Sequence, residues 1–167
     1  MSPEPCDAWL AAQRPAIDGA LAAVLARAGA TTETLGEALT HAVLLGGKRL
    51  RPALAVAAGE ALAPSAGSEP ALMAGVAVEL IHAYSLVHDD LPCMDDDDER
   101  RGRPTVHVKY GEGPAVLVGD SLLTEAFALA LRAPGLSDTQ RVQVGRELAH
   151  VAGYLGMIGG QAAGQLR

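Results

Sequence analysis

Six aspartates lie within the ten residues from Asp89 to Asp98, directly after a long apolar segment. At an effective dielectric near 20, two like unit charges about 4 Å apart repel by roughly 4 kcal/mol, so such a cluster favours protonation, solvation or a bound cation. Arg100, Arg101 and Arg103 follow at once. We expect these arginines to serve phosphate rather than mainly the aspartates, because guanidinium forks match phosphate oxygens and magnesium commonly bridges carboxylate to phosphate. The segment therefore predicts a metal-bridged diphosphate site.

A solvated run of surface charge is the alternative interpretation of the aspartates. We prefer the metal site because Asp89 and Asp95 lie on either side of Pro92, a residue that ends or kinks a helix, so the two carboxylates could hold one or more cations together. Zinc is not expected, although His82 and His88 lie nearby in the sequence. Neither histidine has a clear second partner, and magnesium prefers hard oxygen ligands.

The segment Gly46–Pro52 (Gly-Gly-Lys-Arg-Leu-Arg-Pro) places three cations in four residues between two expected helices. Basic residues at a helix C-terminus also complement the helix dipole, and the segment lacks the spacing of a nucleotide P-loop. Alone, it leaves both a structural role and an anion site open. Together with the aspartates, a separate basic site around Lys48 and Arg51, three residues apart, suits two phosphorylated substrates better than one.

Three further side chains have both a structural and a functional interpretation. His82 either donates to a phosphate or is a satisfied core histidine. Tyr84, five residues before Asp89, is first of all a core side chain. The amide of Gln161, which ends a Gly-Gly-Gln segment, is either structural or ligand-facing, and the sequence does not decide between the two.

The composition indicates an all-helical protein of one domain. Of 167 residues, 49% are hydrophobic and only 3% aromatic, which suits closely packed helices. Capping and turn residues predict helices over 7–28, from Thr31 or Thr32 to 45, and over 52–62, 71–91, 114–132 and 138–154. Segments 63–70 and 92–111 are expected to be irregular, and the glycines from Gly153 to Gly164 to loosen the chain after the last helix.

The expected helix 71–91 has two different faces. Apolar residues recur at helical spacing along one of them, at Ala77, Leu80, Tyr84, Val87 and Leu91. An adjacent flank carries His82, Ser85 and Asp89. One helix therefore carries both a core stripe and a polar stripe, and the aspartates lie at its end.

Charge and targeting signals exclude several classes of protein. A formal net charge of −7, without basic runs interleaved with aromatics, argues against a nucleic-acid surface. Because Cys6 and Cys93 are the only cysteines, neither a disulfide framework nor a cysteine zinc site is expected. We see no signal peptide and no apolar run of the roughly eighteen residues that a membrane span needs. A soluble protein in a reducing cytoplasm is the expectation.

The motifs together resemble those of the trans-isoprenyl diphosphate synthases, or polyprenyl synthetases, most of all the bacterial farnesyl diphosphate synthase branch. They are Gly-Gly-Lys-Arg-Leu-Arg-Pro at 46–52, Asp-Asp-Leu-Pro-Cys-Met-Asp at 89–95, Arg-Arg-Gly-Arg-Pro-Thr-Val-His at 100–107 and Gly-Gly-Gln at 159–161. The resemblance implies an all-α isoprenoid synthase helical bundle around a deep apolar cavity, usually homodimeric. It implies that residues 1–167 are the N-terminal part of a single polyprenyl synthetase domain, truncated before the C-terminal helices.

The resemblance also implies roles for individual residues. Isopentenyl diphosphate would be joined head to tail to an allylic diphosphate, dimethylallyl or geranyl, through a magnesium-assisted allylic cation. Several Mg²⁺ ions, which Mn²⁺ could replace, would bind first to Asp89 and Asp95. The catalytic set would be Asp89, Asp90, Asp95 and Arg100, with Arg100 facing the allylic diphosphate. The isopentenyl diphosphate would be bound by Gly47, Lys48, Arg51, His82 and Arg101. Bulk at Tyr84, beside Ser85, limits product length in the family and suggests farnesyl diphosphate as the product.

The chain also departs from the family. The second aspartate-rich motif and its accompanying lysines are missing, and Gly164 stands where the family typically has aspartate. We therefore expect the isolated chain to be inactive or a poor catalyst. The alternative function is a non-catalytic half-synthase or diphosphate-binding subunit that needs a partner, since the second aspartate-rich motif is absent. A truncated bundle would expose apolar helix faces, so dimerisation, misfolding or aggregation is expected unless a partner covers them. A terpene cyclase of the same fold is a further alternative, although it would not need Lys48, Arg51 and His82.

Overall fold

The computed structural model describes residues 5–27, 32–44 and 46–165. Its helices are α1 (Pro5–Ala26), α2 (Glu33–Leu44), α3 (Leu50–Leu62), α4 (Glu69–Asp89), α5 (Val106–Tyr110), α6 (Glu112–Leu131), α7 (Asp138–Ala152) and α8 (Met157–Gln165). The described residues add a short 3₁₀ turn, η2 (Pro64–Ala66), and a two-stranded antiparallel ribbon of β1 (Glu99–Arg100) and β2 (Arg103–Pro104). The expected all-α fold is confirmed.

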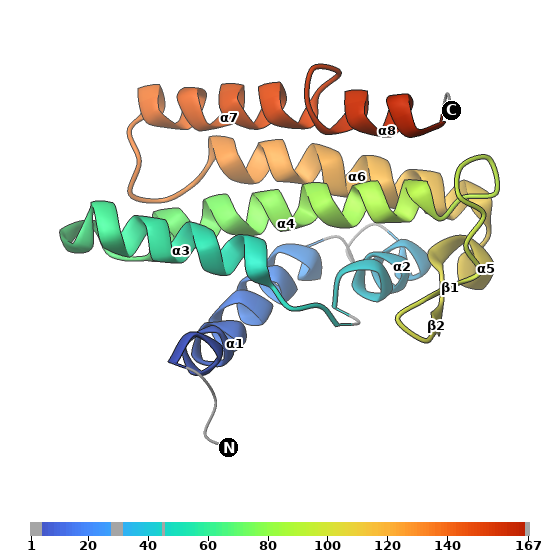
Figure 1. The fold of residues 1–167 in the computed structure, drawn as a ribbon, viewed down its shortest axis with the longest axis horizontal. Helices are drawn as coiled ribbons and strands as arrows, with labels where there is room; N and C mark the ends of the chain where they lie inside the picture. The colour runs from blue at the N-terminus through green and yellow to red at the C-terminus, as the bar shows by residue number, and fades with distance from the viewer. Residues whose placement is uncertain (1–4, 28–31, 45, 166–167) are drawn as a thin grey trace.

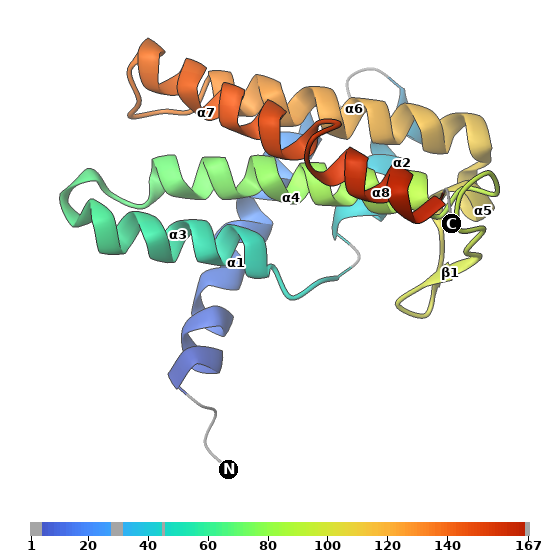
Figure 2. The same ribbon diagram turned by 45° about the horizontal axis from the view of Figure 1, so that its top comes forward.

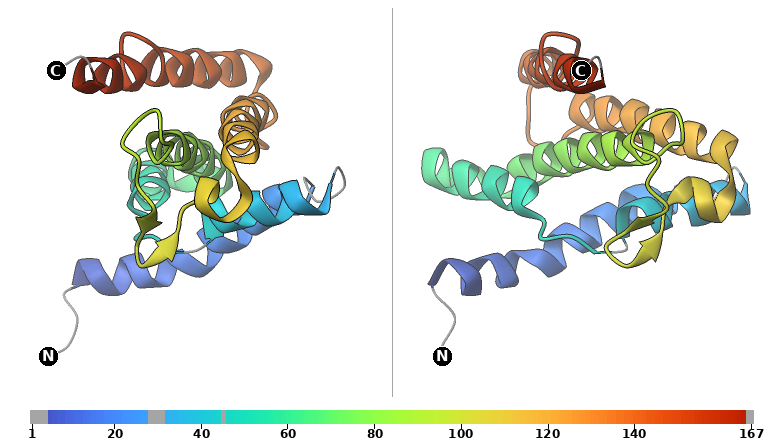
Figure 3. Two further views of the ribbon diagram at one scale, coloured as in Figure 1. Left: turned by 90° about the vertical axis from the view of Figure 1, so that its right-hand side faces the viewer. Right: turned by 45° about the vertical axis from the view of Figure 1, so that its right-hand side comes forward.

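The helices are arranged in layers around α4 (Figure 1). α4 lies beside α3 and α6 in a middle layer, while α1 and α2 cross on one side and α7 and α8 lie on the other (Figure 3). The loop that follows α4 lies next to the far end of α8 (Figure 2). The C-terminal end of α4 is thus the place where distant parts of the sequence meet.

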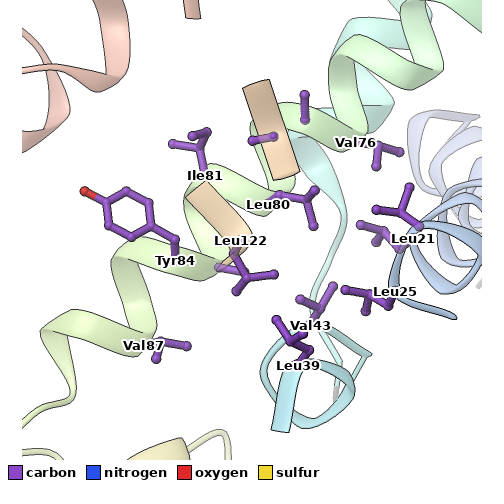
Figure 4. Packing of buried hydrophobic residues seen from close by; sticks show 14 of the residues in the cluster. Leu21, Leu25, Leu39, Val43, Val76, Leu80, Ile81, Tyr84, Val87 and Leu122 are labelled. Atoms are coloured by element: carbon purple, nitrogen blue, oxygen red, sulfur yellow. The ribbon is translucent and has the colours of Figure 1, made fainter. Parts of the chain in front are cut away.

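The core forms where α4 meets α1, α2 and α6. Figure 4 shows Leu80 of α4 on the side of Leu21 and Leu25 from α1, whereas Tyr84 points away from them. The predicted apolar stripe is confirmed, because all of its members are buried: Ala77, Leu80, Tyr84, Val87 and Leu91. Burying one leucine or valine side chain contributes roughly 1.5–3 kcal/mol, so this stripe fixes the rotation of α4 and the direction of its polar flank.

α4 and α6 are in close contact where Gly119 faces His88. A Cβ atom added at Gly119 would overlap the His88 imidazole, so any other residue there requires the ring to move. The His88 Nε2 atom lies 3.2 Å from the carbonyl oxygen of Val116. The same ring packs edge-on against Tyr84, with the ring centroids 5.3 Å apart. His88 therefore belongs to the packing between the two helices.

α2 and α7 begin with side-chain caps, whereas the starts of α3, α4, α5 and α6 have none among the described residues. The Thr32 hydroxyl accepts a hydrogen bond from the Leu35 amide at 3.3 Å, and Ser137 with Gln140 forms a capping box at the start of α7. α3 and α4 each begin two residues earlier than expected, because proline is compatible with the first turn of a helix. The expected ends of the first two helices, at 28 and 45, and the alternative cap Thr31 lie outside the described residues.

Two segments that we expected to be irregular are partly regular. Within 92–111, the β1–β2 ribbon turns at Arg101 and Gly102, whose φ angles of 56° and 72° suit a tight hairpin, and α5 follows. Gly153 and Gly156 do separate α7 from α8, but residues 157–165 are helical. Each glycine in a helix interior costs about 1 kcal/mol relative to alanine, so α8 depends on contacts with the rest of the molecule.

Two helices also correct the expectation about apolar runs. α4 and α6 each contain an 18-residue window that is long and apolar enough for a membrane span, with 56% and 39% of those windows buried inside the structure. Length and composition alone do not make either helix a span, because core helices pass the same test. α4 and α6 pack along each other, and α4 carries the buried acid Glu79.

Candidate functional site

A basic cleft forms where α4 meets the segment between α2 and α3. Its lining includes the residues predicted to bind one diphosphate: Gly47, Lys48, Arg51, His82 and Arg101. Arg14, from α1, lines the same cleft and was not predicted. The structure thus brings the basic segment, His82 of α4 and Arg101 to one cleft, whereas Arg100 and Arg103 line a different depression. Their binding of a diphosphate stays a prediction.

Backbone conformation brings the basic segment to this position. Gly46 and Gly47 have φ angles of 113° and 133°, which side-chain-bearing residues rarely adopt. A Cβ atom at Gly47 would lie 2.9 Å from the Arg101 Nη1 atom, so a larger residue would require the end of that side chain to shift. Arg101 Nη1 donates a 2.6 Å hydrogen bond to the Gly46 carbonyl oxygen. The tip of the β1–β2 ribbon is thereby attached to the basic segment.

His82 is the half-buried member of the cleft. Burial lowers the pKa of its imidazole below the ordinary value of 6.5, Arg51 lowers it further, and the Glu79 carboxylate acts in the opposite direction. The ring is therefore neutral at neutral pH in the free protein. An anion bound between His82 and the arginines would favour the protonated ring.

The second part of the site is a pair of carboxylates at the end of α4. The amide of Asp95 donates to the Asp89 carbonyl oxygen at 2.8 Å, which brings the two residues together after the helix ends. The side-chain Nε2 group of Gln161 donates to Asp89 Oδ1 at 2.7 Å, and that of Gln165 donates to Asp95 Oδ1 at 2.8 Å. The sequence left open whether the Gln161 amide is structural or faces a ligand. In the structure it contacts a carboxylate, that of Asp89.

The environment of this pair favours a bound cation. Burial raises the pKa of the Asp89 carboxyl above its ordinary value, and the nearby Asp95 and Asp90 raise it further, whereas Gln161 and Arg100 oppose the shift. Among the described residues, no three or more histidine, cysteine, aspartate or glutamate side chains are grouped closely enough to hold a metal by themselves. Two carboxylates fit Mg²⁺ that completes its octahedral shell with water and phosphate oxygens.

Asp90 differs from its neighbour, since it is buried and paired with Arg100. The Arg100 Nε atom donates to both Asp90 oxygens, at 2.9 and 3.1 Å, and Nη2 donates to Oδ1 at 2.5 Å. This hydrogen bonding is the main reason that the pKa of Arg100 is raised. Our expectation that the arginines do not mainly serve the aspartates is wrong for Arg100. The hairpin returns it to the end of α4, where a buried carboxylate needs a counter-charge.

Tyr84 and Ser85 lie on α4 between the cleft and the acidic pair. Burial raises the pKa of the Tyr84 hydroxyl, and Asp89 and Asp120 add to the shift. The Ser85 hydroxyl donates to the His82 carbonyl oxygen at 2.9 Å, a local bond within the helix. Their role in product length stays a prediction.

The fold and site define a helical protein with a basic cleft beside a pair of carboxylates suited to a hard cation. The chain belongs to the polyprenyl synthetase family, because the family model for polyprenyl synthetase matches residues 32–163. The family resemblance seen in the motifs is therefore confirmed.

Individual relatives agree with this assignment. Farnesyl diphosphate synthase of Escherichia coli (strain K12) is 53% identical over 128 residues, which are 75% of this chain and 42% of that protein. A chloroplastic geranylgeranyl pyrophosphate synthase of Capsicum annuum is 48% identical over 128 residues, 76% of this chain and 34% of that protein. The crystal structure of an FPP/GFPP synthase from Zymomonas mobilis superposes with a TM-score of 0.83 at 38% identity, covering 93% of this chain and 57% of that one. The chain thus spans less than half the length of these two curated relatives.

Proposed function

We propose that this chain carries the two diphosphate sites of a head-to-tail prenyltransferase. The proposed reaction condenses an allylic diphosphate, dimethylallyl or geranyl, with isopentenyl diphosphate to give farnesyl diphosphate. The supporting observation is the placement of two chemically different sites along one flank of α4. His82 in the basic cleft and Asp89 in the acidic pair are seven residues apart, which is two helical turns or about 10 Å on one face. Two diphosphates can lie side by side at that spacing.

The basic cleft is proposed to hold isopentenyl diphosphate. Lys48, Arg51 and Arg101 would neutralise its charge, and Gly47 would allow the phosphate close to the backbone. His82 would take up a proton as the anion binds, because the anion offsets the burial that keeps the free ring neutral. Binding at this point orients the substrate's double bond towards the allylic site.

The acidic pair is proposed to hold the allylic diphosphate through magnesium. Asp89 and Asp95 would be the ligands that the chain supplies, and Mg²⁺ bound there would neutralise negative charge on the departing diphosphate. Asp90 accepts hydrogen bonds from the Nε and Nη2 groups of Arg100. The remaining Nη1 group is proposed to donate to the same leaving group. Asp90 is therefore proposed to position Arg100 rather than to bind metal.

The proposed chemistry follows from this division of charge. The allylic carbon–oxygen bond breaks and gives an allylic cation and diphosphate. The double bond of isopentenyl diphosphate attacks the cation, and a proton leaves to the departing diphosphate, so that a new double bond forms. Tyr84, with Ser85 beside it, is proposed to limit the length of the growing chain. Farnesyl and geranylgeranyl synthases are both among the relatives, so product length requires measurement.

The test is an assay of the purified chain with Mg²⁺, isopentenyl diphosphate and geranyl diphosphate, with products identified by mass spectrometry. High protein concentration and long incubation are used, because the isolated chain is expected to be at best a poor catalyst. A 15-carbon diphosphate whose formation stops when Mg²⁺ is chelated would support the proposal. Lys48→Ala should abolish condensation, whereas Lys109→Ala, outside the cleft, should not. A Lys48→Ala protein that still ionises the allylic diphosphate and releases a cyclic hydrocarbon would instead support a terpene cyclase.

The alternative is a non-catalytic subunit that binds diphosphates and needs a partner. It is favoured by the observation that, among the described residues, no three or more histidine, cysteine, aspartate or glutamate side chains form a group that could hold a metal. In that case the chain would bind both diphosphates but form product only when a second polyprenyl synthetase subunit is added. A homodimer in the cytoplasm is the assembly and location that we propose for the active form, and sedimentation of the chain at several concentrations tests the assembly.

A further inference from the structure

The basic segment carries three cations, and one of them does not face the cleft in the same way as the others. Lys48 and Arg51 are exposed, whereas the Arg49 side chain is 5% exposed. Its guanidinium makes three short contacts with three different elements. Nε donates to Asp18 Oδ1 of α1 at 2.8 Å, Nη1 donates to Glu79 Oε1 of α4 at 3.0 Å, and Nη2 donates to the Val43 carbonyl oxygen of α2 at 2.8 Å.

These contacts form a row of alternating charges, in which Arg14, Arg49 and Glu79 line the cleft. Asp18 accepts from Arg49 through Oδ1 and from Arg14 through Oδ2, at 2.8 and 3.4 Å. On the other side of Arg49, the Glu79 side chain is 8% exposed and lies one turn before His82 on α4. An unpaired carboxylate at Glu79 would repel an anion in the cleft, and the Arg49 guanidinium compensates that charge.

The backbone of Arg49 has an unfavourable conformation that the contacts of its side chain help to stabilise. Arg49 has a φ angle of 53°, in the left-handed region, and its carbonyl oxygen accepts the first bond of α3 from the Ala53 amide at 3.1 Å. Residues other than glycine, asparagine and aspartate rarely adopt this conformation without support. The three side-chain contacts supply that support. This turn separates Lys48 from Arg51 and directs both of them to one cleft.

We propose that Arg49 is a positioning residue for the basic cleft, held by Asp18 and Glu79, and that the site requires its guanidinium fork and not only its charge. The inference rests on the proposed function, because it takes this cleft to be the isopentenyl diphosphate site. Arginine suits the position because its Nε, Nη1 and Nη2 donors point in fixed directions to three separate acceptors. A lysine ammonium at the same place cannot reach all three from one nitrogen.

Two substitutions at this position separate the possible roles, and a third is the control. Arg49→Lys keeps the charge but loses the fork, and Arg49→Gly loses the side chain but accepts the left-handed backbone. Leu148→Ala removes a buried side chain from α7, in the opposite layer, and so destabilises the fold without touching the segment. The affinity of each full-length variant for isopentenyl diphosphate is measured by calorimetry without metal, at a temperature where circular dichroism shows it fully folded.

We expect both Arg49 variants to bind isopentenyl diphosphate on the order of 10- to 100-fold more weakly, the loss that a displacement of about 1 Å causes in a positioned site. Leu148→Ala should bind isopentenyl diphosphate as tightly as the unchanged protein does, even if its melting temperature is as low as that of the Arg49 variants. Hydrogen exchange should accelerate at the Ala53 amide in both Arg49 variants. If Arg49→Lys binds within a factor of about two of the unchanged protein, or if Leu148→Ala weakens binding equally, the inference is overturned.

Failure of the proposed function looks different. If the unchanged chain binds no isopentenyl diphosphate, the proposed substrate is wrong. Hydrogen exchange then decides the positioning role without any ligand. Faster exchange at 46–53 in Arg49→Lys, with exchange in α4 unchanged, supports the role, and unchanged exchange at 46–53 overturns it.

Discussion

The basic cleft and the acidic pair are supported from opposite directions. The cleft is fixed from the interior, where Arg49 and Glu79 form an ion pair whose side chains are 5% and 8% exposed. The acidic pair is held from the surface by α8, a helix without any buried residue, through amides 72 and 70 positions away in the sequence. The difference shows that one site is part of the core, whereas the geometry of the other depends on the docking of a peripheral helix.

This comparison predicts that the largest loss of stability comes from the support of the cleft. Glu79→Ala should lower the free energy of unfolding by about 3 kcal/mol, because it leaves a buried guanidinium without one of its carboxylates. Urea unfolding followed by circular dichroism measures the change. Asp138→Asn, which alters an exposed pair with Arg141, is the control and should change little. Equal effects of the two substitutions would show that the buried pair has no special weight.

Substitutions in the acidic pair should weaken the binding of ligands that depend on magnesium. Asp95→Asn should weaken magnesium-dependent binding of inorganic diphosphate by more than the roughly 10- to 100-fold that loss of an outer-shell partner causes. Calorimetry with and without Mg²⁺ separates the metal-dependent part. Asp98→Asn, three residues further along the exposed loop, serves as the control and should have little effect. If both variants lose affinity alike, the aspartates act as a diffuse run of charge and not as a site.

The support from α8 should have an intermediate effect on the same binding. Gln161→Ala should weaken it about tenfold, since the amide orients a carboxylate that is proposed to bind the metal. Gln165→Ala should weaken it less, because that amide contacts Asp95 at an exposed position. The exposed Gln143 of α7 provides a matched glutamine-to-alanine control. An unchanged affinity in Gln161→Ala would mean that the carboxylates hold their positions without α8.

The smallest effect is a pH dependence of stability from the cleft. The pKa of His82 in the folded protein lies below 6.5, its ordinary value in the unfolded chain. At a pH between the folded and the unfolded pKa, the unfolded chain therefore binds the proton more readily. This contribution is complete above the unfolded pKa and is lost as the pH falls below about 6.5. His82→Gln should remove that decrease, with a change in melting temperature of less than about 4 °C. Melting curves across this range test it, with the exposed His150→Gln as control.

The sequence predicted those parts of the site that depend on local order. Helical spacing placed His82 and Asp89 on one flank of α4, and glycines and a proline marked the ends that bring Lys48 and Arg51 to the same cleft. It did not predict the partners of Arg49 or of Asp90, because those pairs join residues 31, 30 and 10 positions apart through tertiary packing.

One signal for the buried ion pair was nevertheless present. Glu79 stands among the apolar residues of the core helix, next to Leu80, where an acid requires a partner. A surplus cation in the Lys48–Arg51 segment was the natural candidate. The helix at 157–165 and the hairpin at 99–104 had no comparable signal. Its glycines disfavour the helix at 157–165, and the hairpin at 99–104 depends on the tertiary contact of Arg100 with Asp90.

The contact between Gly119 and His88 limits how this protein can change over generations. A larger residue at 119 collides with the His88 imidazole, and a smaller residue at 88 leaves a void between α4 and α6, which pack along each other. Either substitution alone should weaken the packing of α4 on α6, whereas both together should restore the fit between the helices. The two positions are therefore expected to vary as a pair, and a screen for second-site suppressors of Gly119→Ala should recover smaller residues at 88.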